Sequence, residues 1–208
     1  MTHEHQPTPE KQPPAPEPKP ETPERERDPD RIPRIYVASL ADYVNGRLHG
    51  TWIDATIGAE AIHQQIQAML ATSKEPAAEE WAIHDYENFG PLRLGEYESI
   101  EYVAAVAEQI DQYGEAFAAW LDYTSLDQAD WGSFEESYLG EFNEVTDYVQ
   151  RLIDDLGYEK LLDDTLPATI RPYIRIALAA MAEDLHQSGD IFSLDTDDGT
   201  VYVFTSHW

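Results

Sequence analysis

The hydrophobic pattern that follows the first 33 residues predicts two adjacent strands. Arg34 to Leu40 is a run of strand-forming residues, and Arg47 to Asp54 is a second such run. The segment from Asp42 to Gly46 lies between them and ends in Asn-Gly, a pair typical of tight turns. We therefore expect these two strands to be connected through a turn.

The next segment changes its period and then returns to a strand. Glu60 to Ala71 has apolar residues at positions 62, 66, 69 and 70, which is the spacing of an amphipathic helix. Trp81 to Tyr86 predicts a third strand, and residues 87–95 form a loop. Three strands with one helix predict an α+β module over residues 34–95.

Helical spacing dominates the middle of the chain. Ser99 to Tyr113 has one apolar face, with Ser99 as the expected N-cap and Gly114 as the stop. Glu115 to Tyr123 predicts a second helix, whereas Leu126 to Leu139 fits neither period clearly. We place a central helical module at residues 96–130.

The last part of the chain predicts helices followed by a hairpin. Val145 to Leu156 is a predicted helix that ends at Gly157, and Ile170 to His186 predicts a long helix closed by Gly189. Residues 190–194 and 200–205 read as strands around a turn at Asp198-Gly199. Residues 131–208 therefore form the third expected module, again α+β.

The first 33 residues have a different composition. They hold ten of the fourteen prolines, without apolar residues at regular spacing. Such a segment favours an extended, solvated chain that cannot close a core. We expect residues 1–33 to be a disordered Pro-rich tail.

Charge changes the picture most in residues 94–150. This stretch contains no Lys, Arg or His, and apolar and aromatic residues are distributed through it, so it can fold. Its 14 carboxylates are Glu96, Glu98, Glu101, Glu108, Asp111, Glu115, Asp122, Asp127, Asp130, Glu135, Glu136, Glu141, Glu144 and Asp147. Carboxylates without cationic neighbours repel each other and destabilise the folded state. We therefore expect the charge to be needed for the function of the protein.

The whole chain is strongly acidic, with a formal net charge of -28. This charge argues against binding nucleic acid directly or an anionic membrane, and for binding a basic surface. The chain has no cysteine, no apolar run long enough to span a bilayer, and no apolar core of a signal peptide. We expect a cytoplasmic protein.

Candidate catalytic and metal-binding chemistry is weak. His49 and the His84-Asp85 pair have no visible partner or nucleophile motif, and a structural role explains them better. Residues 195–199 contain several aspartates but lack the register of a calcium loop, and a hairpin turn accounts for them. No nucleotide-binding motif occurs. We predict no catalytic residue, no cofactor and no metal site.

The carboxylates have three interpretations. They can be a solvated face, an adaptation to high salt, or a mimic of nucleic acid. Duplex DNA carries one charge per roughly 1.7 Å of axis. Carboxylates at i, i+3 and i+4 of a helix lie about 5–6 Å apart, comparable to the phosphate spacing along a strand. Such a surface could occupy the basic groove of a DNA-binding protein.

Several segments resemble the ArdA antirestriction proteins. The resemblance is carried by Ile35 to Gly46 with Leu48 to Asp54, by Glu79 to Glu87 with Tyr97-Glu98-Ser99, by Tyr138 to Phe142, and by Gly189 to Phe192. These segments follow in order over about residues 35–204. The Pro-rich tail is extra, and residues 157–175 align poorly.

The resemblance implies an elongated, multi-module α+β protein with small antiparallel sheets and packed helices. It implies a homodimer that mimics bent DNA and inhibits type I restriction-modification enzymes by occupying the DNA channel of the methyltransferase core. Tyr138, Leu139, Gly140, Glu141 and Phe142 look like the family's antirestriction motif, near the dimer contact. Two other functions stay open: an acidic module that binds another basic DNA-binding protein, and a halophilic protein of unknown activity.

Overall fold

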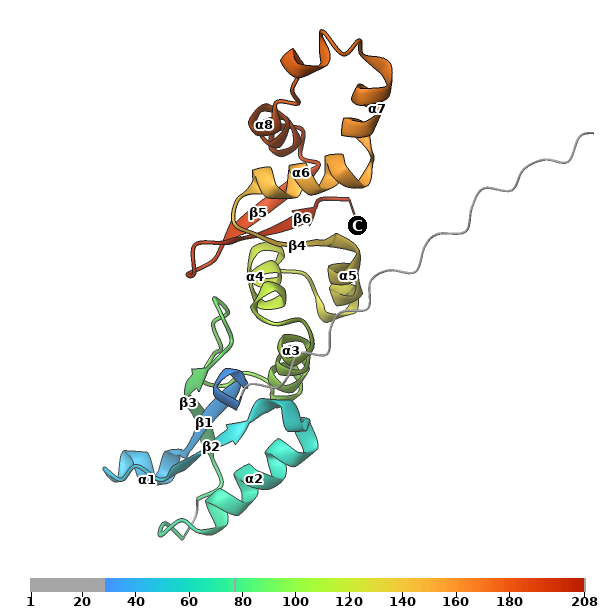
Figure 1. Cartoon of the computed structure of the whole chain (residues 1–208). Coiled ribbons are helices and arrows are strands. Elements are labelled where there is room, and N and C mark those ends of the chain that lie inside the picture. Colours follow the sequence, from blue (N-terminus) through green and yellow to red (C-terminus); the bar gives the residue numbers. More distant parts are fainter. Residues whose placement is uncertain (1–28, 77, 208) are drawn as a thin grey trace, which may run out of the picture.

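The computed structural model describes residues 29–76 and 78–207, and its elements are stacked into an elongated α+β molecule (Figure 1). One small sheet lies near one end, helices α3 and α4 lie in the middle, and a second sheet leads into further helices at the other end (Figure 1). The α+β class is therefore confirmed. Residues 1–28, which make up most of the predicted tail, lie outside the described part.

The first sheet contains the three predicted strands, but the second strand begins at Gly50 and not at the predicted Arg47. It contains β1 (Arg34–Ser39), β2 (Gly50–Asp54) and β3 (Trp81–Glu87), antiparallel in the order β2-β1-β3. Helix α2 (Ala59–Ala71) packs on it through the four predicted apolar positions, which are all buried. A short 3-10 turn, η2 (Ala55–Ile57), connects β2 to this helix.

The predicted turn at residues 42–46 is wrong in its first half, because a short helix, α1 (Leu40–Val44), follows β1 directly. The Ser39 hydroxyl accepts a hydrogen bond from the Asp42 amide at 3.3 Å and caps this helix. The Asp42 carboxylate is buried and accepts hydrogen bonds from the Arg47 guanidinium and the Ser73 hydroxyl. The second half of the prediction holds, because Gly46 follows the helix with φ of 75°.

The central helices match their predictions closely. Helix α3 (Ile100–Tyr113) begins after the N-cap Ser99, whose hydroxyl accepts from the Tyr102 amide at 3.3 Å. Gly114, with φ of 75°, ends α3 and precedes α4 (Glu115–Thr124). The apolar faces of both helices are buried against each other and against the first sheet's layer.

The ambiguous stretch from 126 to 139 contains three short elements. They are the 3-10 helix η3 (Gln128–Ser133), the single turn α5 (Phe134–Ser137) and the start of strand β4 (Tyr138–Phe142). None is long enough to show a period, which explains why the pattern was unclear. Trp131 and Phe134 are buried and fix the segment to α3 and α4.

The C-terminal part is confirmed in its helix α6 and its hairpin. Helix α6 (Val145–Asp155) ends before Gly157, which has φ of 68°. The hairpin consists of β5 (Ile191–Asp195) and β6 (Val201–Thr205), with Thr196 and Thr200 bonded across the turn. A helix α7 (Tyr158–Thr165) follows α6 and had not been predicted.

The long helix predicted from 170 to 186 is wrong in its first half. Residues 171–173 form a 3-10 turn, η4 (Arg171–Tyr173), and only α8 (Leu178–Ser188) is α-helical before Gly189. The Arg171 side chain donates to the Ile174 carbonyl and to the carboxylates of Glu159 and Asp163. These bonds hold the chain in an irregular path that a continuous helix would break.

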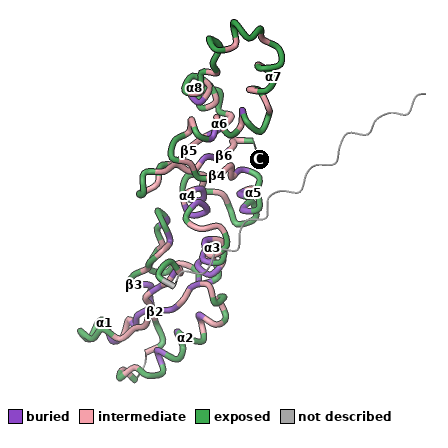
Figure 2. Tube along the Cα trace, in the orientation of Figure 1, coloured by how far each residue is buried: buried purple, intermediate pink, exposed green. Residues whose placement is uncertain are grey.

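The second sheet is covered on both faces. Its order is β4-β6-β5, all antiparallel. Phe204 of β6 packs into the core of the central helices, whereas its neighbour Val203 packs into a separate core with α6 and α8. Consecutive residues of a strand point to opposite faces, so β6 connects the two cores. Figure 2 shows buried residues on both sides of this sheet.

Aromatic side chains fill the layer between the central helices and this sheet. The Phe134 ring lies 5.4 Å from Phe117, 5.5 Å from Trp120 and 5.3 Å from Tyr138, measured between ring centroids. Such pairs contribute about 0.5–1.5 kcal/mol each beyond the area they bury. They join the central helices firmly to the second sheet.

Residues 29–33, the described end of the predicted tail, are attached to the first module. They include the 3-10 turn η1 (Pro29–Arg31). The Asn88 amide donates to the carbonyls of Asp30 at 3.1 Å and Ile32 at 2.8 Å. The folded body therefore begins a few residues before the strand that the pattern marks as its start.

Within the described residues, no helix is both long and apolar enough to cross a membrane.

The aromatic layer generates a prediction about stability. Phe134 is 1% exposed and contacts rings from α3, α4, β4 and β6. Phe134→Ala should lower the free energy of unfolding by about 3–5 kcal/mol, because it leaves a cavity between two packed units. Urea unfolding measures this; a loss below about 1 kcal/mol would show that the layer contributes little.

Candidate functional site: the acidic surface of residues 94–150

The 14 carboxylates of residues 94–150 all reach solvent, and we call them the acidic surface. Twelve of them are exposed, and Glu98 and Asp111 are half-buried. They lie on α3, α4, η3, α5, β4 and α6 and on the connections between these elements. The apolar residues of the same elements turn inward, so one stretch of chain supplies both a core and a charged exterior.

Helix dipoles explain only some of these positions. Glu101, Glu115 and Asp147 lie in the first turns of α3, α4 and α6, where the positive end of the helix stabilises a carboxylate. Asp111 and Asp122 lie in the last turns of α3 and α4, where a carboxylate is unfavourable and neither helix has a basic residue. Stability alone does not account for acids at those ends.

Neutral donors, not cations, contact most of the bonded carboxylates. Glu141 accepts from the Thr200 hydroxyl at 2.6 Å, Glu144 from the Thr146 hydroxyl at 2.9 Å, and Asp147 from the Asn143 amide at 3.3 Å. Glu135 accepts a short bond from the Tyr113 hydroxyl. Such bonds fix the orientation of a carboxylate while its negative charge stays available.

One histidine approaches the acidic surface. His63 of α2 lies 3.3 Å from the Glu101 carboxylate and is cationic only when protonated. The bond from the Ser99 hydroxyl, with those from its own amide and from His63, lowers the pKa of Glu101 below its ordinary value. Glu101 therefore remains ionised at neutral pH. Conversely, burial and the Glu135 bond raise the pKa of Tyr113 to about 12, which keeps this phenol neutral.

Two arginines of the body lie away from the acidic surface, whereas Arg93 lines a hollow together with Asp122 and Asp127. Arg47 binds the carboxylates of Asp42 and Glu75 at the end with the first sheet. Arg171 binds Glu159 and Asp163 beyond α7. Because these arginines are paired with acids of their own regions, they do not neutralise the acidic surface.

The predicted motif of residues 138–142 forms strand β4 at the edge of the second sheet. Leu139 and Phe142 are half-buried and pack against the core of α6 and α8. Tyr138 packs in the other direction, into the aromatic layer. Much of the apolar surface of the motif is thus covered within the chain.

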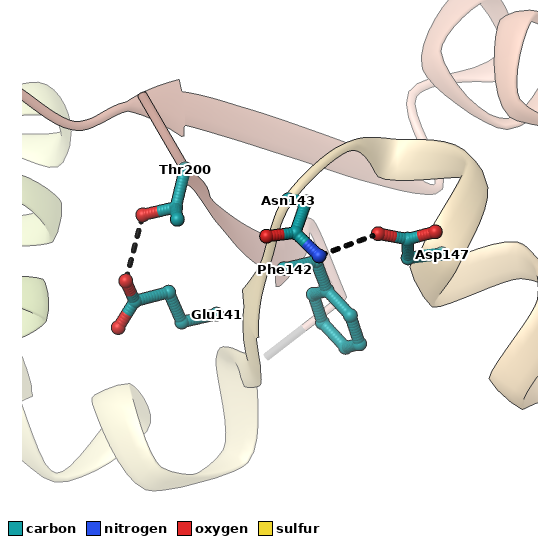
Figure 3. A pocket seen from close by; sticks show the side chains of 5 residues that line it. All are labelled: Glu141, Phe142, Asn143, Asp147 and Thr200. Carbon is teal, nitrogen blue, oxygen red and sulfur yellow. Dashed lines mark hydrogen bonds between the residues drawn. The ribbon is translucent and has the colours of Figure 1, made fainter. Parts of the chain in front are cut away.

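A shallow hollow of about 540 Å³ opens beside the motif, lined by Glu141, Phe142, Asn143, Asp147 and Thr200. Figure 3 shows two bonded pairs among the lining residues, Glu141 with Thr200 and Asn143 with Asp147. The hollow belongs to the acidic surface, because two of its carboxylates line it.

The weak catalytic candidates have structural contacts. His49 bonds the Met69 carbonyl at 2.8 Å, and the His84 ring stacks edge-on with Tyr43 at 4.8 Å. The Asp85 carboxylate accepts from the Tyr86 amide. In the part of the chain that the structure describes, no three His, Asp or Glu side chains converge as metal ligands.

Two contacts had no signal in the sequence. The sequence predicts only a turn at Asp42, yet this residue is buried and bonded to Ser73, 31 positions away. Bonds from the Ser73, Ser39 and Arg47 side chains lower the pKa of Asp42 despite its burial. Arg151 of α6 contacts strand β4. The sequence does not predict this contact, because the hydrophobic pattern before and into β4 fits neither a helix nor a strand.

Fold and surface define an acidic α+β protein with charge suited to a basic partner. A family model described as antirestriction protein (ArdA) matches residues 35–200. The chain therefore belongs to the ArdA family of antirestriction proteins, as its resemblance predicts. A search of curated proteins found no match.

Proposed function

We propose that this protein inhibits type I restriction-modification enzymes by placing its acidic surface in the DNA-binding channel of the methyltransferase core. Membership in a family of antirestriction proteins gives the biological setting. The observation that carries the proposal is the solvent-exposed position of the carboxylates, without arginine or lysine among residues 94–150.

The amount of charge suits this role. Residues 35–208 contain 33 acidic and 7 basic residues. At one charge per roughly 1.7 Å of duplex axis, the excess of acidic over basic residues equals the charge of about 44 Å of DNA. A basic channel would release its bound counterions into solution when it binds such a surface, as it does when it binds DNA. No single carboxylate needs to be decisive, because the attraction is shared among many.

The fold supports charges in fixed places. The aromatic layer joins the central helices to the second sheet, and bonds from Thr200, Asn143 and Tyr113 orient individual carboxylates. A flexible acidic chain would lose conformational freedom on binding, and this packed surface loses less. A partner other than a restriction enzyme, such as another basic DNA-binding protein, would use the same features. A halophilic protein differs in needing molar salt to fold.

Salt dependence tests the electrostatic part of the proposal. Affinity for a type I enzyme should fall as ionic strength rises, because salt screens the attraction between the acidic surface and a basic channel. Titration calorimetry across a salt series measures the dependence, with circular dichroism as the control for folding. An affinity that does not change with salt would refute the mimicry.

Shared charge predicts redundancy. Glu108→Gln should reduce affinity by at most about fivefold, because one exposed ion pair contributes about 0–1 kcal/mol. Neutralising Glu108, Glu115, Asp122, Asp127 and Asp130 together should abolish inhibition while the circular dichroism spectrum stays native. If one neutral substitution alone removed inhibition in a folded protein, a discrete site would replace the distributed surface.

A homodimer is part of the proposal, and the structure offers a surface for it. Residues 156–176, which we call the arch, run from the end of α6 past η4. The arch exposes Leu156, Tyr158, Leu161, Ile170, Tyr173 and Ile174. It has three acidic and three basic residues, so two copies can meet there with little repulsion. The predicted contact at Leu139 and Phe142 is the alternative surface for the same dimer.

The two contacts can be separated by substitution. Tyr173 is 82% exposed, so Tyr173→Asp should give a folded monomer if the arch forms the contact. Leu139→Asp is the matched variant for the motif contact. Sedimentation at tens of micromolar, at low and moderate salt, measures assembly, and low salt should favour monomers because acidic chains repel. A wild type that is monomeric at both salts would rule out the dimer.

A further inference from the structure

Strand β4 contains a bulge at the centre of the motif. Tyr138 lies opposite Phe204 and Gly140 lies opposite Val203, so Leu139 is an extra residue without a partner on β6. A bulge of this kind re-aims the side chains that follow it. It also leaves the extra residue outside the regular ladder of backbone hydrogen bonds.

The bulge determines where Glu141 points. Tyr138 and Phe142 would share a face in a regular strand, yet Tyr138 packs with the aromatic layer and Phe142 with the core of α6 and α8. Glu141 lies opposite Tyr202, which packs with the aromatic layer. Without the extra residue, the Glu141 carboxylate would move to the other face of the sheet.

Gly140 makes this backbone path possible. Its φ is 133°, a conformation that residues with a side chain rarely adopt. A Cβ atom there would lie 3.1 Å from the Phe142 ring. The bulge therefore depends on a glycine at this position and on the ring that packs over it.

Arg151 of α6 contacts Leu139, which precedes Gly140, and Phe142, which lies two residues after it. Its Nη2 atom donates to the Leu139 carbonyl at 2.6 Å, and its guanidinium carbon lies 4.8 Å from the centre of the Phe142 ring. Among the described residues, no carboxylate forms an ion pair with Arg151. In so acidic a chain, this cation contacts a carbonyl and a ring instead of a carboxylate.

We propose that Arg151 is a positioning residue, which holds the bulge of β4 and thereby places Glu141 and the hollow beside it for binding the basic target. This inference rests on the proposed function for its binding consequence, but the geometry of β4 can be tested without it. Arg151 would act through Leu139 and Phe142, without touching the target itself.

Charge makes the binding test decisive, because removing a cation from a DNA mimic should by electrostatics alone leave affinity unchanged or increase it. We expect Arg151→Gln to weaken inhibition of a type I enzyme by at least about tenfold, since a charge-assisted bond and a ring contact are lost. Lys74→Gln is the matched control, because it removes the same charge from an exposed side chain away from β4. Arg151→Lys should restore most of the inhibition.

Amide hydrogen exchange gives the second readout. Residues 139–142 should exchange faster in Arg151→Gln than in wild type or Lys74→Gln, under conditions where all three are folded. If Arg151→Gln does not fold, Arg151→Met replaces it in the experiment. The methionine side chain can still pack over Phe142 but cannot donate to the Leu139 carbonyl.

The outcomes are distinct. Exchange and inhibition equal to those of Lys74→Gln would overturn the positioning role. A different result would separate the two claims. If β4 exchanges faster in Arg151→Gln but the wild-type protein inhibits no type I enzyme, Arg151 holds the bulge and the proposed function is refuted.

Discussion

Repulsion among the carboxylates of residues 94–150 is the constraint on which the rest of the structure depends. The acidic surface carries 14 carboxylates, and residues 94–150 contain no arginine or lysine. The opposing term is the aromatic and aliphatic packing beneath the same helices, where Phe117, Trp120 and Phe134 are fully buried. Burying one such side chain contributes about 1.5–3 kcal/mol. Core and charge are therefore carried by the same segment, which explains why it is both strongly aromatic and strongly acidic.

The second sheet determines how this charged segment is joined to the rest of the chain. Phe204 and Val203 of β6 face two different cores, and the bulge in β4 allows one short strand to serve both. A single cation, Arg151, holds that bulge. Arg47 and Arg171 likewise pair with acids outside the acidic surface, and residues 94–150 contain no arginine or lysine.

Local signals were sufficient to predict much of the fold and the composition of the surface. Ser99 and Gly114 delimit α3 because capping is decided within a few residues, and the absence of cations over residues 94–150 is visible in the sequence itself. Long-range contacts were not predictable. In the helix at 40–44, Asp42 bonds Ser73, which lies 31 positions away, and Arg171 bonds Asp163 at the break before α8. Strand β4 was not predictable because its bulge disrupts the alternation of apolar and polar residues that marks a strand.

Competition with DNA tests the central claim most directly. A type I methyltransferase core is first bound to a labelled DNA duplex that contains its recognition sequence, and the full-length protein is then added. If the acidic surface occupies the DNA channel, the protein should displace the labelled duplex completely, and excess DNA should in turn displace the protein. A stable complex that contains the enzyme, the DNA and this protein together would contradict the account.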